Sequence, residues 1–323
     1  MVSSFPRTYK IAVIGDVHDQ WEIEDNLALE ALKVDLALFV GDFGNESLEI
    51  VGRIASLSLP KAVILGNHDA WYSATSWGRK KCPYDRDQED RVTAQLELLG
   101  VAHVGYSKLD LPSLELSIVG GRPFTWGGSE WKNGEFFQER YNISSFAEST
   151  AKIIANIQDT AYNNLIFLGH NGPAGLGKEA EAICGRDWQP LGGDHGDPDL
   201  AAAIAQAQLL GKQVPLVSFG HMHHRLRHTT SRLRNPVVTS EMGTVYLNAA
   251  SVPRILHSDR GKSRNFSLVT LEEGLVTEAS LIWLNDNFEI ISNRKLYHSG
   301  ASIDRLSPHT PHPTPHTPLP IDS

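Results

Sequence analysis

The sequence is poor in cysteine, lacks long apolar runs and carries no basic excess. Its 323 residues include only two cysteines, Cys82 and Cys184, which lie far apart and form no CxxC pair. Neither a disulfide framework nor a thiolate zinc site is indicated, and a reducing, cytoplasmic setting is expected. The formal net charge of -9 argues against long nucleic acids as partners and favours a small substrate.

The N-terminus, MVSSFPRTYK, lacks the apolar stretch and the cleavage site of a secretory signal. No segment approaches the roughly 20 apolar residues that span a bilayer, so no membrane contact is expected. With 41% hydrophobic and 21% charged residues, the composition is typical of a globular protein that buries a core. We expect one α/β domain over residues 7–290.

Five short apolar runs share one pattern, in which a buried strand ends in Gly followed by a residue that can bind a metal ion. Near-continuous apolar runs of this length are typical of strands that are covered on both faces of a sheet. They are IAVIGD (11–16), LALFVGD (36–42), AVILGN (62–67), LIFLGH (165–170) and LVSFGH (216–221).

Amphipathic segments between the first runs indicate a β-α-β-α-β opening with parallel strands. Residues 21–33 and the segment after Asp42 both carry apolar residues at helical spacing. In open α/β sheets, functional groups gather at the carboxyl ends of the strands. The polar residues that follow the five runs are therefore expected to lie together.

The rest of the chain contains an expected insertion and an expected tail. Residues 172–200 are rich in Gly, Pro and Asp and lead into a helical segment, so we interpret 172–213 as an insertion near the active face. Further strands are predicted in 245–251, 265–273 and 279–285. The Pro- and His-rich segment 301–323 cannot bury a core and is expected to be disordered.

In chain order, the blocks at the strand ends are D-x-H, GD, GNHD, GH and GHxH. They resemble the calcineurin-like metallophosphoesterase superfamily over residues 10–255, with every block present in order. The resemblance implies a four-layer α/β/β/α sandwich, here with an inserted loop and helix segment. The sequence of residues 187–200, which contains DW and GGDHGDPDL, also looks similar to that of a subgroup of these phosphoesterases in cyanobacteria and plastids.

The resemblance implies a dinuclear metal centre in which Asp42 bridges the two ions. One ion would be held by Asp16, His18, Asp42 and His223, and the other by Asp42, Asn67, His170 and His221. Nitrogen and oxygen ligands without thiolate suit manganese, iron, zinc or nickel, and we expect manganese or iron. Two such ions clamp the attacking and leaving oxygens, and a hydroxide that bridges them is the expected nucleophile.

The GNHD block supplies the expected acid catalyst. By the resemblance, His68 protonates the leaving oxygen or stabilises charge on the phosphoryl group. Asp69 is expected to orient His68 through a hydrogen bond.

Three further residues are candidates for substrate binding, each with a structural alternative. Arg122 is either a surface cation or a phosphate contact, for which its forked donors are suited. Asp194 and His195 belong either to a loop that reaches over the metals or to a turn before a helix that Asp197 caps. Two Trp-containing loops, 71–77 and 126–131, either pack or form the wall of a pocket for a planar group.

The sequence thus predicts a metal-dependent hydrolase that cleaves a small phosphomonoester or phosphodiester. Two alternatives stay open. One is a nuclease or cyclic-nucleotide phosphodiesterase of the same superfamily, and the other is a non-catalytic scaffold with this fold.

Overall fold

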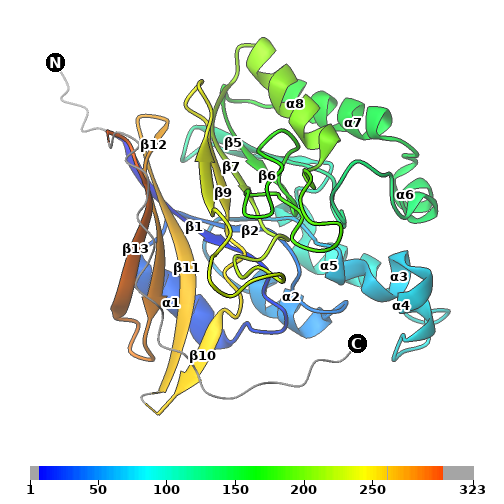
Figure 1. Cartoon of the computed structure of the whole chain (residues 1–323), viewed down its shortest axis with the longest axis horizontal. Coiled ribbons are helices and arrows are strands. Elements are labelled where there is room, and N and C mark those ends of the chain that lie inside the picture. The colour runs from blue at the N-terminus through cyan, green and yellow to red at the C-terminus, as the bar shows by residue number, and fades with distance from the viewer. Residues whose placement is uncertain (1–6, 260, 301–323) are drawn as a thin grey trace.

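The structure is a computed structural model that describes residues 7–259 and 261–300, so the expected tail at 301–323 lies outside the described residues. Two mixed sheets form the centre of the fold (Figure 1). The seven-stranded sheet has the order β13-β12-β11-β1-β2-β3, and β10 pairs with β11. Its strands are β1 (Thr8–Ile14), β2 (Leu36–Phe39), β3 (Lys61–Val63), β10 (Ile255–Ser258), β11 (Gly261–Glu272), β12 (Leu275–Leu284) and β13 (Ile290–His298).

The six-stranded sheet has the order β4-β5-β6-β7-β9-β8. Strands β5, β6, β7 and β9 run parallel, as do β1, β2 and β3 in the other sheet. The strands of the six-stranded sheet are β4 (Lys108–Leu111), β5 (Leu116–Gly120), β6 (Asn164–Leu168), β7 (Gln213–Phe219), β8 (Val237–Thr239) and β9 (Val245–Asn248).

Helices cover the outer faces of the two sheets and complete the layers (Figure 1). α7 packs on α8, and both contact the six-stranded sheet, whereas α2 packs on α5. The helices are α1 (Ile23–Leu32), α2 (Leu48–Ala55), α3 (Trp71–Ala74), α4 (Ser76–Lys80), α5 (Arg91–Leu99), α6 (Gly134–Tyr141), α7 (Phe146–Gln158) and α8 (Pro198–Leu209), with the 3-10 helices η1 (His68–Ala70) and η2 (Gly100–Ala102). Among the described residues, none of these helices is long and apolar enough to cross a membrane.

Strand β1 shows why the apolar runs are nearly continuous. Ile11 and Val13 pack in the core between the two sheets, whereas Ala12 and Ile14 pack in the core that lies under the helices. Successive side chains of a strand point to opposite faces, so a strand between two cores must be apolar at every position. The predicted four-layer α/β/β/α class is confirmed.

The structure adds elements that the sequence patterns did not predict. The first Trp-containing segment, 71–77, was expected to be a loop but lies largely in the short helices α3 and α4. β13 pairs with β12 along Ile290–His298 and so continues the sheet past residue 290, where we expected the domain to end. β13 alternates little and is largely exposed, which is why its pattern gave no strand signal.

Candidate metal centre

The seven expected metal ligands come together where the two sheets meet. They follow the carboxyl ends of β1, β2 and β3 in one sheet and of β6 and β7 in the other. Their ligand atoms form tight groups: those of Asp16, His18 and His223 lie within 4.8 Å of one another, as do those of Asp42, His170 and His221. They match the two sets that the resemblance implies except at Asp42 and Asn67: Asp42 is grouped with His18 through a third close group that contains His68, and the Asn67 amide oxygen lies 2.9 Å from His170 Nε2.

The backbone at these strand ends is strained. Four of the seven expected ligands have positive φ although none is a glycine: Asp16 (45°), His18 (44°), Asp42 (56°) and His221 (66°). Such conformations are costly for residues with a Cβ and cluster at functional sites. The strain lets each strand end turn its side chain sharply toward the shared centre.

Two glycines before the ligands are needed for close packing. A Cβ at Gly66 would lie 2.3 Å from Asp42 Oδ1 and 2.6 Å from His170 Cε1. At Gly41, with φ of +97°, a Cβ would lie 2.5 Å from the Gly66 nitrogen. No larger residue fits at either position, because the space belongs to the side chains that converge on the centre.

Two acceptor oxygens and a second imidazole nitrogen surround His170 Nε2. The other ring nitrogen, Nδ1, lies 2.8 Å from the Val40 carbonyl oxygen and must be its donor, because a carbonyl only accepts. In the neutral ring Nε2 then carries a lone pair, yet it faces Asn67 Oδ1 at 2.9 Å, His221 Nδ1 at 3.2 Å and Asp42 Oδ1 at 3.3 Å. Lone pairs that converge in this way suit a shared cation.

The other group has the same character but is more open. His18 Nε2 and His223 Nε2 are 3.1 Å apart, and His223 Nε2 lies 3.0 Å from Asp16 Oδ2. Asp16 is fully buried, and its Oδ1 accepts a hydrogen bond from the His221 amide at 2.9 Å. Asp16 Oδ2, also buried, has no hydrogen-bond partner among the described residues.

The charge states of these groups suit metal binding. Burial alone would raise the pKa of Asp16, but the imidazole of His223 and its neighbours hold that pKa below its usual range. Burial likewise opposes ionisation of Asp42, while the nearby His170 lowers its pKa. Burial also lowers the pKa of His221 well below its usual value. Burial alone would lower the pKa of His223, but the neighbouring Asp16 raises it, so this imidazole must release its proton to ligate a cation. Ionised carboxylates and neutral imidazoles ligate divalent cations, and with that proton released the residues present fit a two-metal centre.

His68 lies at the rim of the centre. It forms a third close group with His18 and Asp42, and its amide donates to Asp42 Oδ1 at 2.9 Å. Its Nδ1 lies 2.7 Å from Asn45 Oδ1, and its ring stacks on Trp71 with centroids 4.7 Å apart. With Nδ1 engaged and the ring held flat, Nε2 is the nitrogen left to meet a substrate.

The expected role of Asp69 is wrong. Its carboxylate accepts hydrogen bonds from the backbone amides of Asp42, Phe43 and Gly66 at 2.7–2.9 Å, and no hydrogen bond joins it to His68 in the described part of the chain. Asp69 is fully buried, because the turn at η1 directs its side chain back beneath the ends of β2 and β3. It therefore shapes the loop that carries Asp42.

Arg122 lies behind the centre and is not placed to bind phosphate. Its guanidinium pairs with Asp197 at 2.7 Å and with Asp199 at 2.9 Å, and the residue is 3% exposed. Asp197 precedes α8 as expected, with Pro198 at its first turn, but its side chain bonds Arg122 and Thr125 and does not cap the helix. This buried cluster fixes the inserted segment to the end of β5.

The structure separates the neighbours Asp194 and His195. Asp194 accepts hydrogen bonds from the Gly175 and Gly196 amides and so shapes its own loop. His195 lies beside the centre: its ring is parallel to that of His221, with 6.3 Å between centroids, and its Nε2 donates to the Trp126 carbonyl at 3.0 Å. Of the three expected substrate contacts, only His195 is brought to the metal ligands.

An aromatic wall adjoins His68 and His195 and was only partly foreseen. Trp71, on which the His68 ring stacks, also contacts Trp126, with 5.3 Å between the ring centroids. The Trp188 ring contacts His195 edge-on, with 4.8 Å between the centroids. The Trp-containing loops carried a sequence signal for the first two. Asn45 and Trp188 carried none, because nothing local shows which side chain will reach the GNHD block.

Comparisons with solved structures show the fold at low sequence identity. One crystal structure has 12% identity and a TM-score of 0.50, over 87% of this chain and 99% of that chain. A dimetal phosphatase from Danio rerio has 11% identity and a TM-score of 0.47, over 90% and 99% of the two chains. A Thermus thermophilus protein has 11% identity and a TM-score of 0.47, over 90% and 100%.

No curated protein matches the chain. A family model described as calcineurin-like phosphoesterase matches residues 9–225, which is more than half of the chain and includes every expected metal ligand. The chain therefore belongs to the calcineurin-like phosphoesterase family.

Proposed function

We propose that this protein hydrolyses a small phosphomonoester or phosphodiester with the help of two divalent metal ions, manganese or iron. The observation that carries the proposal is the convergence of ligand atoms on His170 Nε2, which faces two acceptor oxygens, Asn67 Oδ1 and Asp42 Oδ1, and the His221 imidazole within 3.3 Å. A buried site of this kind is unfavourable unless a cation lies among the acceptors. Bound divalent ions would supply Lewis-acid charge to the phosphoryl group and acidify water for attack on phosphorus.

The chain's own residues divide the remaining work. Asp42 shares one close group with His18 and another with His170 and His221, which supports assigning its carboxylate to both ions. His68 stands beside Asp42 with Nε2 free, and we assign to it the proton delivered to the leaving oxygen. Asn45 and Trp71 hold the His68 ring in this position.

The aromatic wall favours an ester with a flat ring. Trp71 and Trp126 are only half buried, so part of each ring remains available beside His68. Stacking on a tryptophan suits an aryl or nucleobase group, which is why a cyclic-nucleotide phosphodiesterase is the second candidate. The net charge of -9 supports a small substrate over a long nucleic acid, and the free Cys82 and Cys184 support a cytoplasmic setting.

A metal-reconstituted activity panel tests the proposal. The protein is loaded with manganese or iron, its metal content is measured, and aryl phosphomonoesters, aryl phosphodiesters and cyclic nucleotides are compared. We expect about two ions per chain and metal-dependent turnover of at least one class. A protein that binds far less metal and gains no activity on metal addition is instead a scaffold.

The variant His68→Ala tests the division of labour. It should keep its metal content but lose about 10²–10⁴-fold in kcat, because acid catalysis contributes that much. His257→Ala is a matched control, since His257 lies exposed on β10 away from the ligands. Full activity of His68→Ala with unchanged metal content would remove His68 from the mechanism.

A further inference from the structure

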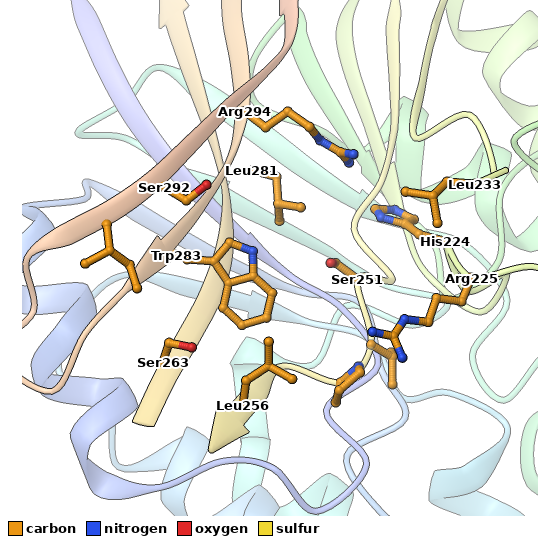
Figure 2. A pocket seen from close by; sticks show the side chains of 13 residues that line it. His224, Arg225, Leu233, Ser251, Leu256, Ser263, Leu281, Trp283, Ser292 and Arg294 are labelled. Atoms are coloured by element: carbon orange, nitrogen blue, oxygen red, sulfur yellow. The ribbon is translucent and has the colours of Figure 1, made fainter. Parts of the chain in front are cut away.

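A cavity lies at the edge of the seven-stranded sheet, beside the loop that follows the expected ligand His223. Its volume is about 400 Å³. On one side it is bounded by the face of β10–β13, and on the other by the segments 224–225, 233 and 251–253 (Figure 2). The lining residues are His224, Arg225, Leu233, Ser251, Val252, Pro253, Leu256, Ser263, Leu281, Trp283, Ile291, Ser292 and Arg294, and none is an expected metal ligand.

Strand register explains how the sheet builds this face. Leu281 and Trp283 are two residues apart on β12 and so share one side of the sheet. Their partners on β13 are Arg294 and Ser292, respectively. Ala279, two residues before Leu281, belongs to the core between the sheets. The cavity therefore continues that core to a place where loops, and not the second sheet, lie opposite.

Two arginines line the cavity without a carboxylate partner. Neither Arg294 nor Arg225 has an acidic group within 4.0 Å in the described part of the chain, and the buried Nε of Arg294 has no hydrogen-bond acceptor there. Burial lowers the pKa of the Arg294 guanidinium. In Figure 2 the Arg294 side chain extends from β13 toward His224, whereas Arg225 lies lower down on the opposite, loop side of the cavity.

The arginines that are almost fully buried in the described part of the chain all have a carboxylate partner. Each has a carboxylate oxygen within 3.4 Å: Asp197 for Arg122, Asp187 for Arg234, and Asp25 for both Arg254 and Arg264. A guanidinium withdrawn from water is costly without an anion nearby. Arg294 is partly buried and faces a cavity, where an anion from outside can approach it.

The apolar part of the lining defines the rest of the ligand. The Trp283 indole stands in the middle of the cavity wall, between Leu281 on one side and Leu256 on the other (Figure 2). The lining also includes the apolar side chains of Leu233, Val252 and Pro253. Such a surface, with a few polar groups at its edges, suits a flat apolar body.

We propose that this cavity binds a small organic anion that carries a flat aromatic ring, with a carboxylate or a phosphoryl group as its charge. The anionic group meets the guanidinium of Arg294 and the ring packs on Trp283, while Arg225 at the other end of the cavity adds positive charge. Guanidinium forks match both carboxylate and phosphoryl oxygens, which is the chemistry that the two ligand classes share. The site is separate from the metal centre and does not depend on its reaction.

Calorimetric titration of the metal-loaded full chain tests the proposal with probes that are not esters. 2-Naphthoate and 1-naphthylphosphonate carry both the ring and the charge, 2-naphthylmethanol carries the ring alone, and inorganic phosphate carries the charge alone. We expect at least one of the two charged naphthyl probes to bind at a site that Arg294→Gln weakens roughly tenfold or more, because a charge-assisted hydrogen bond is lost. The stronger of the two identifies the ligand class.

Matched variants separate the site from general effects. Lys295→Gln removes one positive charge from the neighbouring position on β13, where Lys295 pairs with Glu278, and should leave binding unchanged. Trp283→Leu keeps both arginines and should weaken the ring-bearing probes. Arg225→Gln at the exposed rim gives a second charge test if Arg294→Gln lowers the melting temperature. Binding that is absent, or equal in the wild type and both arginine variants, overturns the proposal.

Discussion

The two groups of candidate metal ligands differ in how deeply they are buried. In the group of Asp42, His170 and His221, His170 is 0% exposed, the adjacent Asn67 is 2% exposed, and the His170 ring packs against Gly41 and Gly66. In the group of Asp16, His18 and His223, the His223 side chain is 39% exposed and His18 is half buried. The buried group is thus held by packing before any metal arrives, whereas the open group faces the side from which substrate can approach.

Asp42 lies in one close group with His170 and His221 and in another with His18, so its removal should have the largest effect. Asp42→Ala is expected to lose both ions and to reduce phosphoesterase activity to that of the metal-free protein, because this carboxylate lies close to ligands of both groups. Metal analysis and turnover of an aryl phosphate measure the effect. Glu97→Ala, an exposed carboxylate on α5, serves as control. Retention of one tightly bound ion in Asp42→Ala would show that the groups bind independently.

Alanine variants of His170 and His18 test the contrast directly. His170→Ala should lower metal content and also destabilise the metal-free protein by about 2–5 kcal/mol, as expected when a fully packed side chain is removed. His18→Ala should lower metal affinity by about 10–100-fold or more with little change in the stability of the metal-free protein. Thermal unfolding in chelator and metal titration provide the two measurements. Equal destabilisation by both variants would contradict the difference in packing.

Trp71 provides the smallest and finest test of the open group. Trp71→Leu removes the ring on which His68 stacks, with its centroid 4.7 Å away, but keeps an apolar side chain. An aromatic pair contributes about 0.5–1.5 kcal/mol, so kcat/KM should fall roughly two- to tenfold with metal content unchanged. Trp77→Leu is the control, because Trp77 contacts Trp71 edge-on and is 51% exposed. If the two variants behave alike, Trp71 does not position His68.

The sequence was informative about the strands and the residues that follow them. A strand packed on both faces must be apolar throughout, so the runs that end at Gly15, Gly41, Gly66, Gly169 and Gly220 were recognisable without any long-range contact. β13 was not recognisable, because an edge strand that is mostly exposed needs no such pattern. The short helices α3 and α4 were also missed, since four or five residues carry too little periodicity.

By itself, the sequence determined the α/β opening with parallel strands and the order in which candidate ligands follow the strands, because both depend on local patterns. Its motif blocks implied the four-layer sandwich through the family resemblance. Tertiary structure decided what the other polar groups do. Asp69 and Arg122 were predicted to be site residues, yet Asp69 binds backbone amides and Arg122 pairs with Asp197 and Asp199. The tertiary structure also leaves the buried Nε of Arg294 without a hydrogen-bond partner among the described residues. The partner of a buried charge depends on which distant segments pack beside it, and no local pattern records that choice.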